Sequence, residues 1–479
     1  MLYGYTYENC VAFFPCYPLS VSTLARITST IGILHFSSWV LLIGMTLNIV
    51  LFLMTSLVLF RLGKAVLGDE DVAFYGSILF CINPASIFMS ALYSETMFSF
   101  FLFYALLILN RKATFMASIL IGFSVFTRSN GIVGIGFIIH KIVKIFVKTF
   151  SQQRDSTKMN SSNVFHSLLL VLKTVFKIVI YLLTSLIPFG LYQYYIYQKF
   201  CLPSSTASDL PNHIVTYGRS QGYKIVGDEP SSWCNQSIAL SYSYIQHHHW
   251  GVGFLAYYEL KQLPNFLLAF PVILLSFRSC WYYFTQNKNS FFRLGLNVKQ
   301  KLKDDIINSG PEISTHDVRT KKRTVSRNDP FREEAEDDSL KTRIKWNGCT
   351  GSDNLSAHSK LVVYVFHLAA LTVFGCLFMH IQVLTRLLFS SSPLLYWYVA
   401  TVFIQGYKPP TTQAGNRPKQ DLLIPFFIQK LLTTMRLNFI NKVFSNWPYL
   451  SFEFRMCFIY FLTYCVIGTL MFANFLPWT

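Results

Sequence analysis

Long apolar stretches separated by shorter polar segments dominate the chain. A membrane-spanning helix needs about 20 apolar residues, and five stretches reach that length, near 36–60, 166–197, 253–284, 360–383 and 455–476. Five others are shorter or interrupted, near 72–91, 96–110, 113–127, 132–149 and 388–404. The pattern predicts an all-α polytopic membrane protein with about ten transmembrane helices.

The interruptions in the shorter stretches are polar. They fall at Asn83-Pro84, at Tyr93-Ser94-Glu95, between Thr127 and Gly131, and at Ser392-Pro393. Polar breaks at membrane depth are tolerated only where protein or a water-filled cavity covers them. The broken helices therefore predict an internal site.

Lys and Arg in the loops predict the orientation, because cytosolic loops carry an excess of both. If ten spans alternate, the segments rich in these residues all fall on one side. We therefore predict four regions: a lumenal N-terminal segment (1–35), a transmembrane region (36–284) with a lumenal loop (198–252), a cytosolic disordered loop (285–359) and a C-terminal transmembrane region (360–479).

Composition supports this assignment. Hydrophobic residues make up 52% of the 479 positions and charged residues only 13%, against about 25% charged in an average soluble protein. The net charge of +18 is explained by cytosolic loops. A nucleic-acid partner is not expected, because no basic face accompanies a recognisable nucleic-acid-binding fold.

The cysteines and histidines do not indicate a metal or cofactor site. Cys10, Cys16, Cys201 and Cys234 fall on the predicted lumenal side, where a disulfide can persist, although the sequence leaves open whether any of them pair. The run from His247 to His249 resembles a metal cluster, but adjacent helical residues point in different directions. We expect neither a metal nor a cofactor.

Glu95 is a candidate functional residue, because an ionisable group in an apolar stretch is costly. The alternative is a helix N-terminal charge that stabilises the macrodipole. Arg128, followed by the turn Ser129-Asn130-Gly131, suits a phosphate if free backbone amides lie beside it. Arg386 is a second cation of this kind, and snorkelling to the interface is the alternative for both.

Several motifs resemble the PIG-V family of GPI mannosyltransferases, and they occur in order from about Tyr3 to Thr479. The matching segments are Asn83 to Phe88, Ala91 to Glu95, Arg128 to Gly131, Tyr257 to Gln262, Pro264 to Phe266, His380 to Arg386, Tyr396-Trp397 and Asn474 to Thr479. Together they cover almost the whole chain.

The resemblance implies a multi-pass enzyme of the endoplasmic reticulum membrane with the GT-C architecture. It would transfer the second mannose, in α1,6 linkage, from dolichol-phosphate-mannose to the lipid precursor of the GPI anchor, with inversion and without a cofactor. The expected substrate-binding residues are Arg128, Asn130, Tyr93 and Arg386. A stabilising membrane subunit is a further expected partner.

The chain departs from the family in one respect. The family carries a Trp-Asp pair in its first lumenal loop, after an N-terminal span, and that Asp is the expected base. Here Met1 to Pro15 matches the family downstream of that Asp. Because a missing base costs about 10²–10⁴-fold in rate, the chain as written is expected to be impaired, unless Glu95 or Glu8 is the catalytic base.

Two other functions remain open at this stage. One is a non-catalytic membrane component of the same pathway, either a lipid-handling protein or a partner subunit of a mannosyltransferase. The other is a different dolichol-dependent GT-C enzyme. An assay of mannose transfer in microsomes tests the first alternative, because a non-catalytic component shows no transfer by itself. The one-mannose GPI acceptor tests the second, because a different enzyme would use the same donor but fail on this acceptor.

Overall fold

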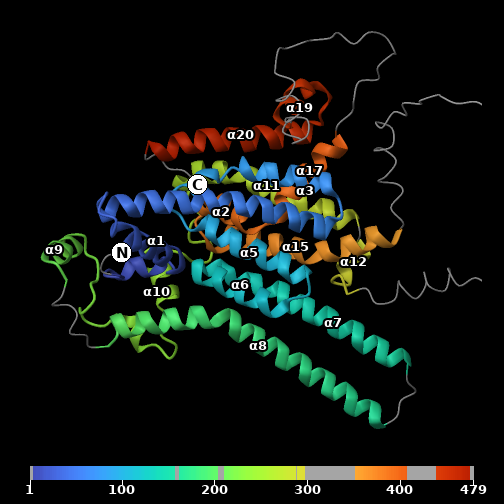
Figure 1. The fold of residues 1–479 in the computed structure, drawn as a ribbon, viewed down its shortest axis with the longest axis horizontal. Coiled ribbons are helices and arrows are strands. Elements are labelled where there is room, and N and C mark those ends of the chain that lie inside the picture. Colours follow the sequence, from blue (N-terminus) through green and yellow to red (C-terminus); the bar gives the residue numbers. More distant parts are fainter. Residues whose placement is uncertain are drawn as a thin grey trace, which may run out of the picture.

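The computed structural model describes residues 4–156, 161–202, 210–286, 288–296, 351–406 and 439–474. Within these ranges the chain is helical apart from turns and one isolated β-bridge between Tyr7 and Ile225. The long helices lie side by side along the long axis of the molecule (Figure 1). The all-α fold predicted from the sequence is confirmed.

Six helices in the described ranges are long and apolar enough to cross a membrane. They are α2 (Phe36–Leu67), α7 (Ile135–Ser156), α8 (Ser161–Phe200), α11 (Leu263–Gln286), α15 (Gly351–Phe378) and α20 (Phe452–Ala473). A seventh span results if the segment Ile381–Ser391 and helix α17 (Pro393–Gly406), which are bent by 76° at Ser392, count as one.

The expected number of about ten spans is therefore not confirmed. Helices α5 (Glu95–Asn110) and α6 (Thr114–Thr127) contain 16 and 14 residues. At 1.5 Å per residue they extend only about 24 and 21 Å, whereas the hydrocarbon core is about 30 Å thick. The stretch 72–91 is divided between α3 (Glu70–Cys81) and α4 (Ser86–Ser90). The polar breaks end these helices early.

The broken and shorter helices form the core. Helix α17 is buried from Pro393 to Phe403, as expected of a helix that is apolar on all sides. Helix α5 packs against α2, α6 and α16 (Leu384–Ser391). The outer faces of α2 and α8 instead expose large apolar side chains such as Leu57 and Leu191, which is typical of a surface that contacts lipid.

The predicted lumenal segments gather at one end of the molecule (left in Figure 1). They include η1 (Glu8–Ala12), α1 (Cys16–Ser29), α9 (Asn212–Ser220), η4 (Ser232–Asn235) and α10 (Ser241–His248). Helices α12 (Lys288–Phe292) and α19 (Phe439–Ser445) lie at the opposite end. Segments predicted to lie on opposite sides of the membrane are thus found at opposite ends of the molecule. Most of the loop predicted over 285–359 lies outside the described residues.

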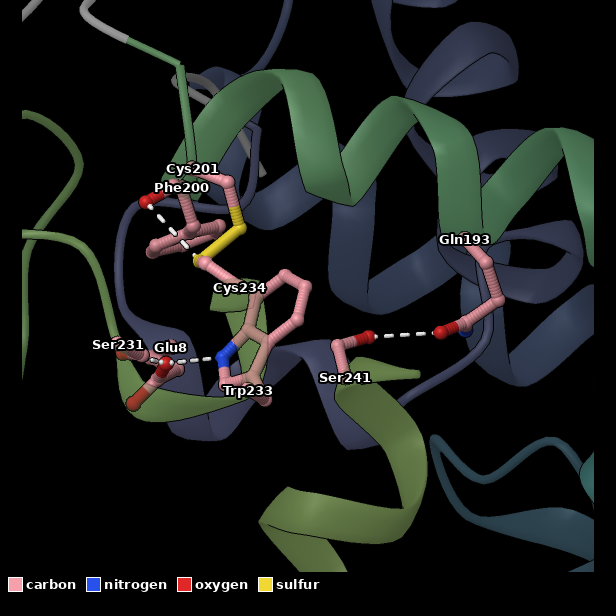
Figure 2. Close-up of a disulfide and its surroundings, with 8 residues drawn as sticks. All are labelled: Glu8, Gln193, Phe200, Cys201, Ser231, Trp233, Cys234 and Ser241. Carbon is pink, nitrogen blue, oxygen red and sulfur yellow. Dashed lines mark hydrogen bonds between the residues drawn. A yellow bond between two sulfur atoms is a disulfide. The ribbon is translucent and has the colours of Figure 1, made fainter. Parts of the chain in front are cut away.

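A disulfide joins Cys201, after the end of α8, to Cys234 in η4 (Figure 2). The other two predicted lumenal cysteines, Cys10 and Cys16, are free thiols. Next to the bridge, the fully buried Trp233 side chain packs in a small apolar core with Val11, Ile196 and Ile245. The disulfide thus fastens the loop predicted to be lumenal to the end of the apolar helix α8.

We expect the replacement of Cys201 and Cys234 by serine to destabilise the lumenal end. The bridge spans a sequence separation of 33, and closing a loop of that length stabilises a fold by roughly 3–4 kcal/mol. Thermal unfolding of the purified protein in detergent should show a lower Tm. Cys10→Ser, which removes a free thiol, is the control, and equal Tm values for both variants would contradict the bridge.

Candidate functional site

Glu95 begins helix α5, directly after a turn at the polar interruption of the apolar stretch. Asn83 follows the end of α3 and precedes α4, and its Oδ1 accepts a hydrogen bond from the Ala85 amide at 2.8 Å. The chain then turns over residues 91–94, where the Tyr93 amide donates to the Ala91 carbonyl at 2.7 Å. Glu95 is therefore both the first residue of α5 and a carboxylate that is completely buried.

Arg128 follows helix α6 in an extended conformation, and the short 3₁₀ helix η2 (Ser129–Gly134) comes next. Gly131 makes this reversal possible, because a Cβ atom there would lie 2.6 Å from the Val125 backbone nitrogen. The turn directs the Arg128 guanidinium to Glu95, with Nη1 2.5 Å from Oε1. The Gly131 amide donates to the Arg128 carbonyl at 3.0 Å, so this amide is not free for a phosphate.

Arg386 reaches the same carboxylate from helix α16. Its Nη1 lies 3.7 Å from Oε1 of Glu95. Its guanidinium carbon lies 5.2 Å from the centre of the Phe88 ring and 5.9 Å from that of the Tyr93 ring. Both distances fall within the usual range for cation–π attraction, so two aromatic faces and one carboxylate fix the orientation of Arg386.

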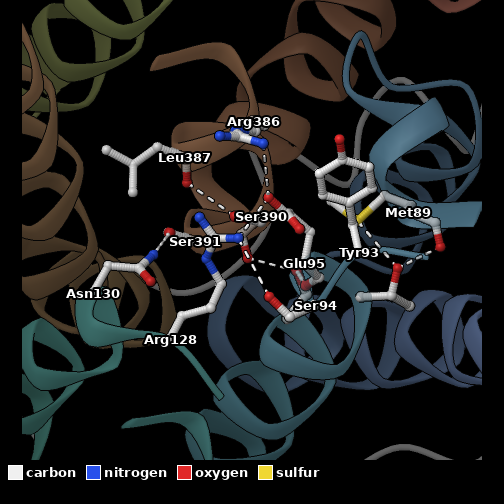
Figure 3. A network of polar contacts seen from close by, with 12 residues as sticks. Met89, Tyr93, Ser94, Glu95, Arg128, Asn130, Arg386, Leu387, Ser390 and Ser391 are labelled. Atoms are coloured by element: carbon white, nitrogen blue, oxygen red, sulfur yellow. Dashed lines mark hydrogen bonds and ion pairs between the residues drawn. The ribbon is translucent and has the colours of Figure 1, made fainter. Parts of the chain in front are cut away.

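We call Glu95, Arg128 and Arg386 the arginine–glutamate cluster (Figure 3). Helices α5 and α16 and the extended residue between α6 and η2 contribute to it. The carboxylate is fully buried, whereas the Arg128 and Arg386 side chains are 21% and 22% exposed. Two cations and one anion leave one positive charge in excess. Glu95 therefore occupies the inner side of the two guanidinium groups, and their exposed side can bind a further anion.

Hydrogen bonds between the surrounding elements support the cluster. Asn130 Nδ2 donates to the Ser391 hydroxyl at 3.0 Å, and the Ser99 hydroxyl donates to the Ser390 carbonyl at 2.7 Å. These bonds connect α16 to η2 and to α5 (Figure 3). Five of the six predicted site residues are therefore brought together: Tyr93, Glu95, Arg128, Asn130 and Arg386.

Glu8, the sixth predicted residue, lies in a separate cluster of the lumenal end (Figure 2). Its buried carboxylate accepts hydrogen bonds from Ser231 and from Trp233, whose Nε1 is 2.8 Å away. His249 Nε2 lies 3.6 Å from the other carboxylate oxygen. These contacts fasten the N-terminal segment to the loop 198–252, next to the disulfide.

Helix α10 connects the two clusters. At its start, the Tyr242 and Ser129 hydroxyls share a hydrogen bond of 2.6 Å, and Ser129 directly follows Arg128. Burial raises the pKa of Tyr242, against the opposing charge of Arg128, so the phenol stays protonated at neutral pH. At its other end, His249 faces Glu8. Eight helical residues extend about 12 Å, which separates the two carboxylates into different sites.

His248 and His249 of the histidine run point in different directions, as the sequence predicts. The His248 ring stacks on Tyr244 at 5.1 Å, whereas His249 faces Glu8. Within the described ranges, no three His, Cys, Asp or Glu residues are placed to hold a metal ion together.

Sequence reasoning missed Asn48, which lies in the middle of helix α2. Its side chain is fully buried, and its Nδ2 donates to the Tyr93 carbonyl at 2.9 Å and also to the Ala91 carbonyl. A lone amide within the apolar stretch 36–60 was a usable signal, because a polar side chain at membrane depth requires a partner.

The known proteins that this chain matches belong to one family. Residues 2–479 match the family model described as "Mannosyltransferase (PIG-V)". The chain is 34% identical to the GPI alpha-1,6-mannosyltransferase 2 of Cricetulus griseus and 33% identical to that of Homo sapiens, with 100% of this chain and 85% of each relative covered. It is 30% identical to the GPI mannosyltransferase 2 of Drosophila pseudoobscura pseudoobscura, over 99% of this chain and 83% of the relative. No solved structure matches.

Proposed function

The chain belongs to the PIG-V family of mannosyltransferases, and from this premise we propose that its arginine–glutamate cluster binds the phosphate of dolichol-phosphate-mannose. The chain is a multi-pass membrane glycosyltransferase of GPI-anchor biosynthesis. Its acceptor is accordingly a GPI precursor lipid. In the proposed reaction the mannose is the second one added, in α1,6 linkage, in the endoplasmic reticulum membrane.

The excess positive charge of the cluster carries this proposal. In the transfer, an acceptor hydroxyl attacks the anomeric carbon of mannose, the bond from that carbon to the phosphate oxygen breaks, and the hydroxyl proton goes to a base. Dolichyl phosphate leaves with an additional negative charge. Arg128 and Arg386 stabilise that charge, because preorganised cations act strongly where charge develops in a site that excludes water.

Glu95 has a positioning role in this proposal. Oε1 of its buried carboxylate faces both guanidinium groups. It holds the two arginines, which would otherwise repel each other. Glu8 accepts hydrogen bonds from Ser231 and Trp233, in the cluster at the other end of α10. The base role expected of Glu95 or Glu8 stays a prediction.

The remaining predicted residues align the cluster. Tyr93 presents its ring to Arg386, and Asn130 fixes η2 to α16 through Ser391. A stabilising membrane subunit and the dolichol-linked donor are part of the proposal and follow from the family resemblance. The exposed apolar face of α8 offers a surface on which either lipid or such a subunit can pack.

Mannose transfer in isolated membranes tests the proposal. Membranes that contain the full chain and lack other activity of this kind should transfer labelled mannose from dolichol-phosphate-mannose to a one-mannose GPI acceptor. Dolichyl phosphate should inhibit competitively with the donor, whereas dolichol, the matched control without phosphate, should inhibit weakly or not at all. Equal inhibition by both lipids would contradict phosphate binding, and absence of transfer by folded protein would favour the non-catalytic function.

A further inference from the structure

Asn48 is a fully buried amide in the middle of the 32-residue helix α2. Both of its recorded hydrogen bonds leave its own helix: Nδ2 donates to the Ala91 and Tyr93 carbonyls. Two carbonyl acceptors require a donor, and this fixes which end of the amide faces them. Its Oδ1 has no hydrogen-bond partner among the described residues, so the side chain is specialised for donating to this turn.

The turn that Asn48 holds is the non-helical link between α4 and α5. Ala91 is extended, with φ −72° and ψ 179°, so its carbonyl cannot accept a regular helical hydrogen bond. Gly44, one turn before Asn48, lets Leu92 pack directly on α2, because a Cβ atom there would lie 2.1 Å from a Leu92 methyl group. The turn therefore rests on one face of α2, with Asn48 as its polar anchor.

The position of this turn determines the geometry of the arginine–glutamate cluster. Tyr93, whose carbonyl Asn48 holds, presents its ring to Arg386. Two residues later, Glu95 begins α5 and binds both arginines. A shift of the turn moves the aromatic face and the carboxylate together, although Asn48 itself does not touch either arginine in the recorded contacts.

We infer that Asn48 is a positioning residue for the proposed phosphate site: it holds the turn at residues 91–93 and thereby sets the places of Tyr93, Glu95 and Arg386. This inference rests on the proposed function of those residues. A buried donor or acceptor that is left without a partner costs desolvation free energy, and the two carbonyls of the turn have the Asn48 amide as a donor.

Steady-state kinetics of Asn48→Ala in the full chain test the inference. We expect the KM for dolichol-phosphate-mannose to rise about tenfold or more, with a smaller change in kcat, because donor binding depends on the arginine geometry. Asn48→Asp fills the same space but cannot donate to the two carbonyls when ionised, and should be impaired to a similar degree. It serves as the second variant if the alanine protein does not fold.

Thr55→Ala is the matched control, because Thr55 is also buried in α2 but donates only to Leu51 within the helix. It should keep the KM within about twofold of the parent protein. A double-mutant cycle with Arg386→Ala separates positioning from general damage, because residues that act through one network are not additive. Asn48→Ala should then add less than about twofold to the loss caused by Arg386→Ala.

The outcomes are distinguishable. An Asn48→Ala protein with the same KM as Thr55→Ala overturns the inference. Losses that multiply in the double variant overturn it too, since Asn48 then does not act through Arg386, while an impaired Arg386→Ala still supports the phosphate site. Normal transfer by Arg386→Ala overturns the proposed function and this inference with it.

Discussion

Replacing Arg128 by alanine should reduce mannose transfer by about 10²–10³-fold, because removal of one preorganised donor from the site of developing charge costs that much. Arg128 contributes the closer of the two contacts to Glu95, and its side chain is partly exposed. Arg128→Lys should recover only part of the activity, since an ammonium group lacks the planar fork that binds phosphate oxygens in pairs.

The measurement is the restoration of GPI-anchored proteins on the surface of deficient cells, together with microsomal transfer at matched protein amounts. Arg26→Ala, which removes an exposed cation of α1 on the same side of the molecule, is the control and should restore the surface signal fully. Full restoration by Arg128→Ala would show that Arg128 only anchors the end of α6.

Replacing Glu95 by alanine should destabilise the protein by about 3–5 kcal/mol, the usual cost of removing one partner from a buried ion pair. Arg128 and Arg386 would then face each other without a counter-charge. Glu70→Ala provides a matched control, because Glu70 also pairs with a cation, Lys64, but both side chains are more than half exposed. That exposed pair should contribute no more than about 1 kcal/mol.

Thermal unfolding in detergent should therefore show a large loss for Glu95→Ala and little change for Glu70→Ala. Glu95→Gln, which keeps the shape of the side chain, separates the two roles considered for this residue. A positioning role predicts a higher KM for the donor, whereas a catalytic base predicts a lower kcat with the KM preserved. Retention of the KM with a large loss of kcat would contradict the positioning role.

Part of the site could be predicted from sequence because its residues interrupt apolar stretches. Glu95 and Arg128 are conspicuous for the cost of placing a charge at membrane depth. The sequence did not show that Glu95 faces both arginines, because the cluster joins α5, the link between α6 and η2, and α16, whose residues are separated by up to about 290 positions. The sequence leaves open whether Glu95 is a base or a helix N-terminal charge, and the tertiary structure adds two cations beside its Oε1.

The difference between the predicted and the observed number of spans also arises because the sequence does not show tertiary contacts. Hydropathy records where apolar residues occur, and it identified the five long stretches that become α2, α8, α11, α15 and α20. It does not record where a helix ends. The turn at Asn83 follows the end of α3, and the reversal at Gly131 follows the end of α6, through local hydrogen bonds and close backbone approach. The central helices are therefore shorter than a membrane is thick.

The sequence by itself determined the class of the protein and singled out most of the residues that the structure brings together around Glu95. These follow from transfer free energies and local chemistry, which act on each segment separately. Only the tertiary structure decided that Glu8 and Glu95 belong to different clusters, that Cys201 pairs with Cys234, and that Asn48 holds the turn before Glu95. Those contacts join residues far apart in the chain, and packing of the helices brings them together.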